Sequence, residues 1–303
     1  LISYQPELEE SNYLDTAWDA GKIGDTQYTI PLDIHASAMY YNQDLLEKYN
    51  VTSWLDDNIV TFDEMMSLAG KMDEGDYVVN NALLSWVILA QIRNLGGAIS
   101  DDAGNPTVNT PEMKEALEKI KALTDAGLMT PYGEDGYLMF QGGNVLLSTD
   151  GTWTSTAHNA VDGLNWGVTN IYSTSDDIAT NRAASHMFGM LKSESRTEEK
   201  KEVIAKFLEF VRTNSIEWAK AGQIVASKDV LESDDYKKYP QSFFTSTPEE
   251  EDTLYIFDYV YFSYVLEALD VYCTDIAYGE LDLDEGLATM QQYVEDKIAE
   301  VAK

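Results

Sequence analysis

Apolar residues recur along this chain with two periods, one typical of strands and one typical of helices, and segments of the two kinds follow each other repeatedly. Residues 28–42, "YTIPLDIHASAMYYN", are apolar at alternate positions and partly β-branched, which predicts one or two strands. The next stretch, 42–51, has the apolar spacing of a short amphipathic helix. Strands therefore interleave with helices from the start, and this order is typical of an α/β fold.

Helix-start signals mark further helices in the first half of the chain. Residues 61–64, "TFDE", form a capping box in front of a helical pattern. Residues 82–97 are apolar nearly all round and end in two glycines, which predicts a buried helix. Residues 98–109 resemble two short strands around a turn. The segment 110–127 then combines a threonine N-cap, a proline at the first helical position and a final glycine, which together define a helix.

The second half repeats this alternation. Residues 164–171 and 185–192 have strand-like patterns, and residues 196–214 form a strongly amphipathic helix. The last helix covers 282–302, where Asp284 is the expected N-cap. The order of elements in both halves favours an α/β protein. A length of 303 residues allows one large core or two domains, since domains cluster near ~100–150 residues.

One short stretch, "QGGNVLLSTDGTWT" at 141–154, combines structural and functional signals. Val145–Leu147 is a short buried strand, and Asp150-Gly151 is typical of a turn. Trp153 then stands at the end of a strand, where open α/β sheets keep their ligand crevice. A tryptophan in the core, shielded by a loop, is the alternative interpretation of this stretch.

The charge balance narrows the class of partner. The chain holds 53 Asp and Glu against 20 Lys and Arg, a net charge of −33, with 44% hydrophobic residues. Such a surface repels the phosphate backbone, which excludes nucleic acid, and it disfavours an anionic bilayer surface. An anionic ligand would need a specific local pocket, whereas neutral or cationic partners fit more easily.

Motifs for chemistry are lacking. His35, His158 and His186 lie far apart and have no metal-ligand spacing, and no nucleophile elbow or phosphate-binding glycine loop occurs. The single cysteine, Cys273, permits no intrachain disulfide and no thiolate metal cage, and its neighbours predict an inert packed thiol. We therefore expect a protein without cofactor, metal or catalytic activity. An acid–base glycosidase remains an alternative, because 53 acids make some carboxylate pair inevitable.

Aromatic residues and short polar groups at strand ends are how binding proteins hold sugars. An indole covers the apolar face of a pyranose ring, while carboxylates, imidazoles and amides bond its hydroxyl rim. The candidates for the first role are Trp153, Trp86 and the aromatics around Tyr261, and those for the second are Asp33 and His35. His186 is a further candidate ligand-binding residue.

Several blocks of this chain resemble one known family. They are "YYNQDLLEKY", "TFDEM", "MFQGGNVLLSTDGTW", "SHMFGMLK" and "WAKAGQIVASKDVLES", and they occur in the order found in the family 1 extracellular solute-binding proteins of ABC sugar importers. The maltose-binding proteins belong to that family. The resemblance runs over the whole chain, and the "YYNQDLLEKY" and "GTW" blocks together are fairly specific.

The resemblance implies a periplasmic-binding-protein-like fold whose two lobes close on a ligand. It also implies an extracellular or periplasmic monomer, with a lipid anchor upstream of this chain. Such a protein passes an oligosaccharide or other neutral small molecule to the permease subunits of an ABC transporter. Trp153 corresponds to a family tryptophan that stacks on sugar. His35 stands where relatives carry a hydroxyl-binding carboxylate, so that Asp33 would supply the acid.

The resemblance also predicts the domain organisation. Hinge strands are expected at 31–36 and 185–190. Lobe 1 would comprise 1–33 with 187–224, and lobe 2 would comprise 37–184 with 228–303. Lobe 1 is expected to lack its N-terminal βαβ strands, with on the order of a hundred residues preceding Leu1, so that the helix at 198–214 keeps an uncovered apolar face.

One alternative ligand class suits both the fold and the charge. A polyamine-binding relative has the same architecture, and a cationic ligand would favour the acidic surface. It would require two or more carboxylates facing the aromatic residues of the site.

Overall fold

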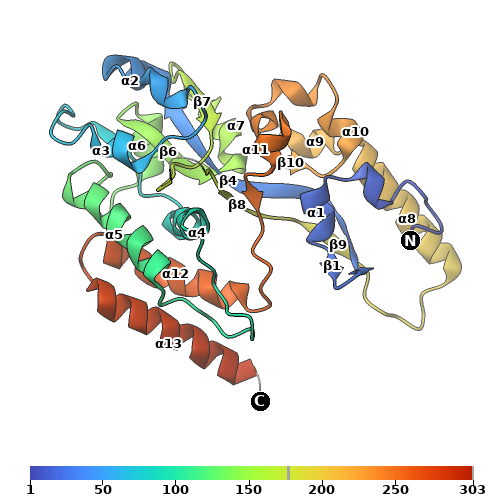
Figure 1. Cartoon of the computed structure of the whole chain (residues 1–303). Helices are drawn as coiled ribbons and strands as arrows, with labels where there is room; N and C mark the ends of the chain where they lie inside the picture. Colours follow the sequence, from blue (N-terminus) through green and yellow to red (C-terminus); the bar gives the residue numbers. More distant parts are fainter. Residues whose placement is uncertain (176–177, 302–303) are drawn as a thin grey trace. The chain divides into compact units, whose positions relative to one another are not determined.

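A computed structural model of the chain describes residues 1–175 and 178–301 (Figure 1). The chain divides into two compact units. Unit 1 consists of Leu1–Ala36, Thr152–Ala160 and Ala183–Ile256. Unit 2 consists of Ser37–Gly151, Val161–Arg182 and Phe257–Lys303. Each unit is therefore built from three segments that are separated in sequence.

Unit 2 is a mixed sheet covered by helices. Strand β4 pairs antiparallel with β6 and with β7, and β6 pairs in parallel with β5. Every residue of β6 is buried. The strands are β4 (Asp33–Asn42), β5 (Tyr77–Val79), β6 (Val145–Gly151), β7 (Trp166–Thr169) and β8 (Asn181–Ala184), the first and last of which continue into unit 1. The α-helices are α2 (Gln43–Lys48), α3 (Phe62–Met66), α4 (Leu84–Asn94), α5 (Pro111–Asp125), α6 (Gly136–Gln141), α12 (Phe262–Ala277) and α13 (Leu283–Val301).

The core of unit 2 confirms the apolar patterns. Helix α4 buries residues on all sides, including Val87, Ile88 and Leu89, and packs with α5 and α12. Thr110 caps α5 through its side chain, with proline at the first position, and the capping box at Thr61 and Glu64 is present. The capping box predicted at 61–64 and the helices predicted at 82–97 and 110–127 are therefore confirmed.

Unit 1 is assembled around the first residues of β4. Asp33 lies opposite Val225 of β10, and His35 lies opposite Ala184 of β8. A separate pair joins β3 to β9 antiparallel. The further strands are β1 (Lys22–Ile23), β2 (Thr26–Gln27), β3 (Thr29–Pro31), β9 (Met187–Gly189), β10 (Ile224–Val225) and β11 (Leu254–Tyr255). The α-helices are α1 (Asp15–Asp19), α7 (Ser155–His158), α8 (Glu198–Thr213), α9 (Ile216–Ala219), α10 (Lys228–Leu231) and α11 (Pro248–Glu251).

Three local predictions were wrong. Asp150-Gly151 is no turn: β6 runs through both residues, because Asp150 pairs with Ala38 and Gly151 with Ser37 of β4. The segment 98–109 contains a single bridge between Ser100 and Pro106 rather than two strands. Helix α13 begins before Asp284, and the Asp282 carboxylate accepts hydrogen bonds from the backbone amides at the start of that helix.

The division into units also differs from the expected ranges. Residues 152–160 and 228–256 belong to unit 1 rather than to unit 2. The chain passes between the units at 36/37, 151/152, 160/161, 182/183 and 256/257. Residues 228–256 join unit 1 because of packing. β10 pairs with the start of β4, and Val225, Val230 and Tyr236 form one cluster with Ala219.

Helix α8 carries the uncovered apolar face that its sequence predicted. Val203, Phe207 and Phe210 follow one another at helical spacing and are 60%, 54% and 63% exposed. Thr197 caps the helix, and its opposite side buries Ala205 and Leu208. Among the described residues, no helix combines the length and the apolar character that crossing a membrane requires.

Candidate functional site

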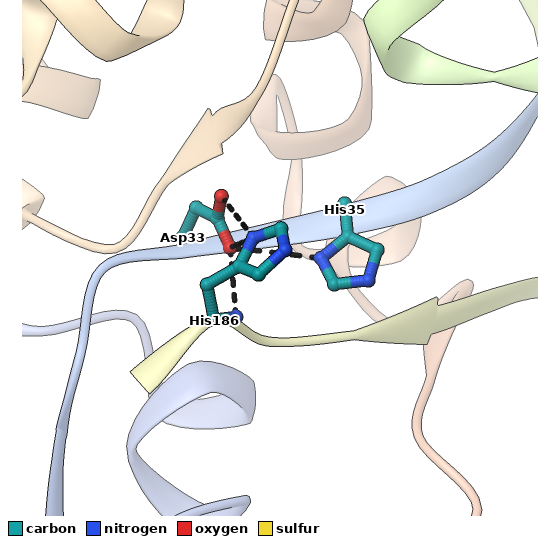
Figure 2. Close-up of side chains that lie close together, drawn as sticks. All are labelled: Asp33, His35 and His186. Carbon is teal, nitrogen blue, oxygen red and sulfur yellow. Dashed lines mark hydrogen bonds and ion pairs between the residues drawn. The ribbon is translucent and has the colours of Figure 1, made fainter. Parts of the chain in front are cut away.

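A buried carboxylate at the start of β4 organises the candidate site in unit 1. Asp33 is 0% exposed, and its two oxygens accept hydrogen bonds from His186 Nδ1 at 3.0 and 2.9 Å. The His186 backbone amide donates to the same carboxylate at 3.0 Å, and Trp218 Nε1 donates at 2.6 Å. His35 Nδ1 lies 3.7 Å from Asp33 Oδ1. Figure 2 shows the two imidazoles turned toward this one acid.

Local structure explains why these groups meet. Asp33 and His35 are two residues apart on one strand, so their side chains point to the same side. His186 follows β8, which pairs with β4, and its carbonyl accepts a hydrogen bond from the Leu32 amide at 2.8 Å. Trp218 comes from the short helix α9. Three separate segments of unit 1 therefore supply one cluster.

Four aromatic rings line up around the carboxylate, and we call them the ring cluster: Trp153, His35, His186 and Trp218. The rings of His35 and His186 stack with centroids 4.2 Å apart, and the edges of Trp153 and Trp218 approach them at 6.1 and 6.4 Å. Trp218 is 38% exposed and the His186 side chain 54% exposed. The ring cluster thus presents rings and imidazole nitrogens to solvent above a buried charge.

Asp33 stays ionised despite its burial. Desolvation alone would raise the pKa of Asp33, but the contacts with His35, Trp218 and His186 more than offset it and lower that pKa below its usual range. An ionised carboxylate accepts hydrogen bonds only, so it fixes His186 with a proton on Nδ1. The opposite nitrogen, Nε2, is then the polar atom that His186 offers to a ligand.

Asp33, His35 and His186 also bring three possible metal ligands within 4.8 Å of one another. A metal bound by two imidazoles lies near the plane of each ring, about 2 Å from the nitrogen. The two rings here stack with centroids 4.2 Å apart, and the Asp33 oxygens already accept hydrogen bonds from His186 and Trp218. The cluster in this conformation is suited to hydrogen bonding rather than to metal coordination.

Trp153 is placed differently from the expectation. It lies in the 3-10 turn Thr152–Thr154 that follows β6, and it is half-buried beside His35 rather than beyond a turn at Asp150. Gly222 supports this turn: its φ is +87°, and a Cβ there would lie 2.3 Å from the Thr152 carbonyl oxygen. Only glycine fits so close to that backbone, so the end of "WAKAG" positions Trp153.

The remaining candidates, Trp86 and Tyr261, belong to unit 2. Trp86 lies in the first turn of α4, where the guanidinium carbon of Arg182 sits 3.6 Å from the centre of its ring. Tyr261 is the N-cap residue of α12 and stacks on Tyr264 at 6.1 Å. Within unit 1 the structure therefore brings together Trp153, Asp33, His35 and His186, while Trp86 and Tyr261 belong to unit 2.

Two notable residues were missed by the sequence reasoning. Trp218 stands in the block "WAKAGQIVASKDVLES", but nothing local indicates that its indole reaches an acid 185 positions earlier. Arg182 lies in a strand pattern next to small residues and carries no motif.

Comparison with known proteins identifies the family. A family model described as bacterial extracellular solute-binding protein matches residues 2–245. This chain is a bacterial extracellular solute-binding protein. One curated relative of this solute-binding protein, a probable ABC transporter-binding protein of Deinococcus radiodurans, is 28% identical over 146 residues. That match covers 43% of this chain and 34% of the relative, so the chain spans about a third of the relative's length.

Solved structures show the same fold for this solute-binding protein. Maltose-bound MalE3 of T. maritima aligns with a TM-score of 0.76 at 18% identity, covering 97% of this chain and 79% of that one. UgpB from Mycobacterium tuberculosis in complex with glycerophosphocholine gives 0.77 at 15%, covering 99% and 79%. The sugar-binding protein MalE from Xanthomonas citri gives 0.78 at 12%, covering 99% and 78%. The predicted α/β fold of the two-lobed binding proteins is thereby confirmed.

Proposed function

We propose that this solute-binding protein captures a saccharide outside the cell and delivers it to the permease subunits of an ABC importer. The observation that carries the proposal is the ring cluster. Trp153 and Trp218 offer indole surface for the apolar face of a sugar ring, and the imidazole nitrogens beside them can bond hydroxyl groups.

The buried carboxylate contributes by positioning the imidazoles. A side chain that bonds sugar hydroxyls binds them better when it is already held in the bound orientation, because less side-chain entropy is then lost on binding. Asp33 holds His186 through two hydrogen bonds and lies 3.7 Å from His35 Nδ1. Pre-oriented donors and acceptors of this kind give specificity among sugars that differ in one hydroxyl.

A polyamine is a weaker candidate on the same geometry. A cationic ligand needs carboxylates that are open to it, whereas the Asp33 oxygens already accept hydrogen bonds from His186 and Trp218. Asp33 is also fully buried, so its carboxylate is not open to an amine. The cluster therefore favours a neutral, hydroxyl-rich ligand over a polyamine.

We further propose that binding acts through a hinge, with segments near 31–36 and 183–190 as the flexible connections. Ligand contacts made in only one arrangement of the two units would shift the population toward that arrangement by their differential affinity. The importer would then recognise the ligand-bound form. Small-angle scattering with and without ligand tests this step, and an unchanged radius of gyration at saturation would contradict it.

A thermal-shift screen against oligosaccharides and polyamines is the first test of the function. A ligand that binds only the native protein raises the melting temperature, by an amount set by its concentration over Kd. We expect hits among oligosaccharides. Release of reducing sugar from a bound oligosaccharide would instead establish a glycosidase, and a response confined to polyamines would refute the saccharide proposal.

Calorimetry on the hit links it to the ring cluster. Trp218→Ala should weaken binding about tenfold or more, because stacking surface at the centre of a small site is lost. Tyr28→Ala is the matched control, since Tyr28 is an aromatic residue of the same unit outside the ring cluster and is 61% exposed. Equal affinities of the two variants would remove the ring cluster from the binding site.

A further inference from the structure

Arg182 in unit 2 is a buried cation held by aromatic faces. Its guanidinium carbon lies 3.6 Å from the ring centre of Trp86 and 4.9 Å from that of Phe262. The residue is 5% exposed. Burial lowers the pKa of Arg182 to about 10, while the more distant charge of Asp270 acts to raise it, so the side chain remains charged at neutral pH.

This cation has no ion-paired carboxylate among the residues that the structure describes. Within residues 1–175 and 178–301, no carboxylate lies at ion-pair distance from Arg182, and its buried Nε has no hydrogen-bond partner. The contrast with Arg212 in unit 1 is direct. Arg212 is similarly buried, at 7%, but it pairs with Glu209 at 2.8 Å and Asp229 at 2.7 Å. In a chain with 53 acids, an unpaired buried arginine is the exception.

Two helix N-termini add to the positive potential at this place. Trp86 is in the first turn of α4, and Phe262 is the first residue of α12. Neither helix has a side-chain cap or an acidic residue in its first turn. Helix N-termini carry partial positive charge and favour anions, so a cation placed against two of them is electrostatically unfavourable in the absence of a third group.

We propose that Arg182, with the first turns of α4 and α12, forms an anion-binding site within unit 2 that takes the charged group of an acidic saccharide. This inference rests on the proposed function. The shared chemistry is that of a carboxylate or a phosphate ester, which the planar guanidinium can bind with two hydrogen bonds. A neutral ligand would leave the charge uncompensated, whereas an anion compensates both the guanidinium and the two helix ends.

The stacking geometry suits this role. Trp86 fixes the guanidinium plane, so little side-chain entropy is lost when the anion binds. The net charge of −33 disfavours the approach of anions to the molecule as a whole. The guanidinium of Arg182 provides a local positive site at which an anion can still bind. An acidic sugar would thus be selected at one point of an otherwise repellent surface.

Calorimetry with matched probes tests the inference. Digalacturonate is compared with its dimethyl ester, which keeps the size and removes the charges, and maltose 6′-phosphate is compared with maltose. We expect one charged probe to bind about tenfold to a hundredfold more tightly than its neutral partner. Whichever pair shows the preference identifies the carboxylate or the phosphate as the source of the anion.

Variants then assign the preference to Arg182. Arg182→Met keeps the apolar contact with Trp86 and should abolish the preference, whereas Arg182→Lys should retain part of it because it keeps the charge without the planar fork. Lys121→Met removes one positive charge from the surface of the same unit and should leave the preference unchanged. Circular dichroism checks that each variant is folded, and the comparison of probes on the unmodified protein needs no variant.

The outcomes separate this inference from the proposed function. If maltose and the dimethyl ester each bind as tightly as their charged partners, the anion site is refuted while saccharide binding stands. If sulfate binds to the unmodified protein but not to Arg182→Met, and no saccharide binds, the anion site stands and the saccharide function fails. If neither sulfate nor any of the four saccharides binds, both are refuted. A charge preference that survives in Arg182→Met also overturns the inference.

Discussion

Replacement of Asp33 by asparagine tests how strongly one buried carboxylate holds the candidate site together. The carboxylate accepts hydrogen bonds from the His186 amide, from His186 Nδ1 and from Trp218 Nε1, at 3.0, 2.9 and 2.6 Å. Asparagine has the same shape but a single acceptor oxygen. At least one of these donors must therefore face an amide NH2 group instead of an oxygen.

The expected loss follows from the three bonds. A hydrogen bond to a charged group contributes ~1.5–3 kcal/mol and a neutral one ~0.5–1.5 kcal/mol, so each bond that loses its charge gives up about 1 kcal/mol. One donor left without an acceptor in the interior costs ~1–3 kcal/mol more, while asparagine avoids the desolvation of a charge. We expect Asp33→Asn to destabilise unit 1 by about 3 kcal/mol at pH 7.

Urea unfolding followed by hydrogen–deuterium exchange mass spectrometry measures this loss. Peptide-level exchange is needed because two units that unfold separately give no single transition. Peptides from unit 1 should lose protection at lower urea in the variant, and peptides from unit 2 serve as an internal reference. Asp25→Asn, at an exposed position of unit 1, is the control and should change stability by less than ~0.5 kcal/mol.

The pH dependence provides a second check. The pKa of Asp33 is lowered in the folded protein, so its contribution is present above the ordinary value of 3.8 and is lost as pH falls through the folded value. The difference between the original protein and Asp33→Asn should therefore shrink on acidification. A difference under ~0.5 kcal/mol at pH 7, or an equal loss of protection in unit 2, would refute the reasoning.

Three further changes test other parts of the molecule. Trp153→Ala should weaken saccharide binding by ~2–4 kcal/mol, roughly thirty-fold to several hundred-fold, with little effect on the unliganded protein; calorimetry that finds unchanged affinity would return this tryptophan to a packing role. Burial raises the pKa of Asp150 from 3.8 to about 6, so the folded state loses stability as pH rises from about 4 to 6. In urea titrations above pH 6, Asp150→Asn should be up to about 3 kcal/mol more stable than the original protein. Burial lowers the pKa of His158 from 6.5 to about 4, so the folded state loses up to about 3 kcal/mol of stability as pH falls across that interval. The free energy of unfolding of His158→Gln should depend less on pH there. The same pH dependence in both proteins would contradict a buried, neutral His158.

Elements with local signals could be predicted from the sequence. The helix at 110–127 has an N-cap, a proline and a final glycine, each of which acts within one turn, and the structure places α5 at Pro111–Asp125. The Asp150-Gly151 turn failed because pairing with Ser37 and Ala38 across the sheet outweighs the preference of that dipeptide. Local preference decides only where no partner strand competes with it.

In the candidate site, too, some proximities follow from the local sequence and others depend on contacts between distant segments. Asp33 and His35 share one strand face at a spacing of two, so their proximity follows from the sequence alone. The approach of His186 depends on the pairing of β8 with β4, and that of Trp218 depends on the packing of α9, neither of which has a local signal. The position of Arg182 could not be predicted for a related reason, because its contacts with Trp86 and Phe262 join segments that are distant in sequence.

Strand β4 is shared between the two units, and this has a consequence for the order in which the protein can fold. Its first residues pair in unit 1 and its later residues pair with β6 and β7 in unit 2. Helices α12 and α13, which complete the core of unit 2, follow all of unit 1 in the sequence. During synthesis, unit 1 can therefore close while unit 2 still exposes apolar surface, and the contacts of α12 and α13 with α4 and α5 that finish it span more than a hundred residues. Such long-range closure is slow, and a nascent chain in that state is a natural substrate for chaperones.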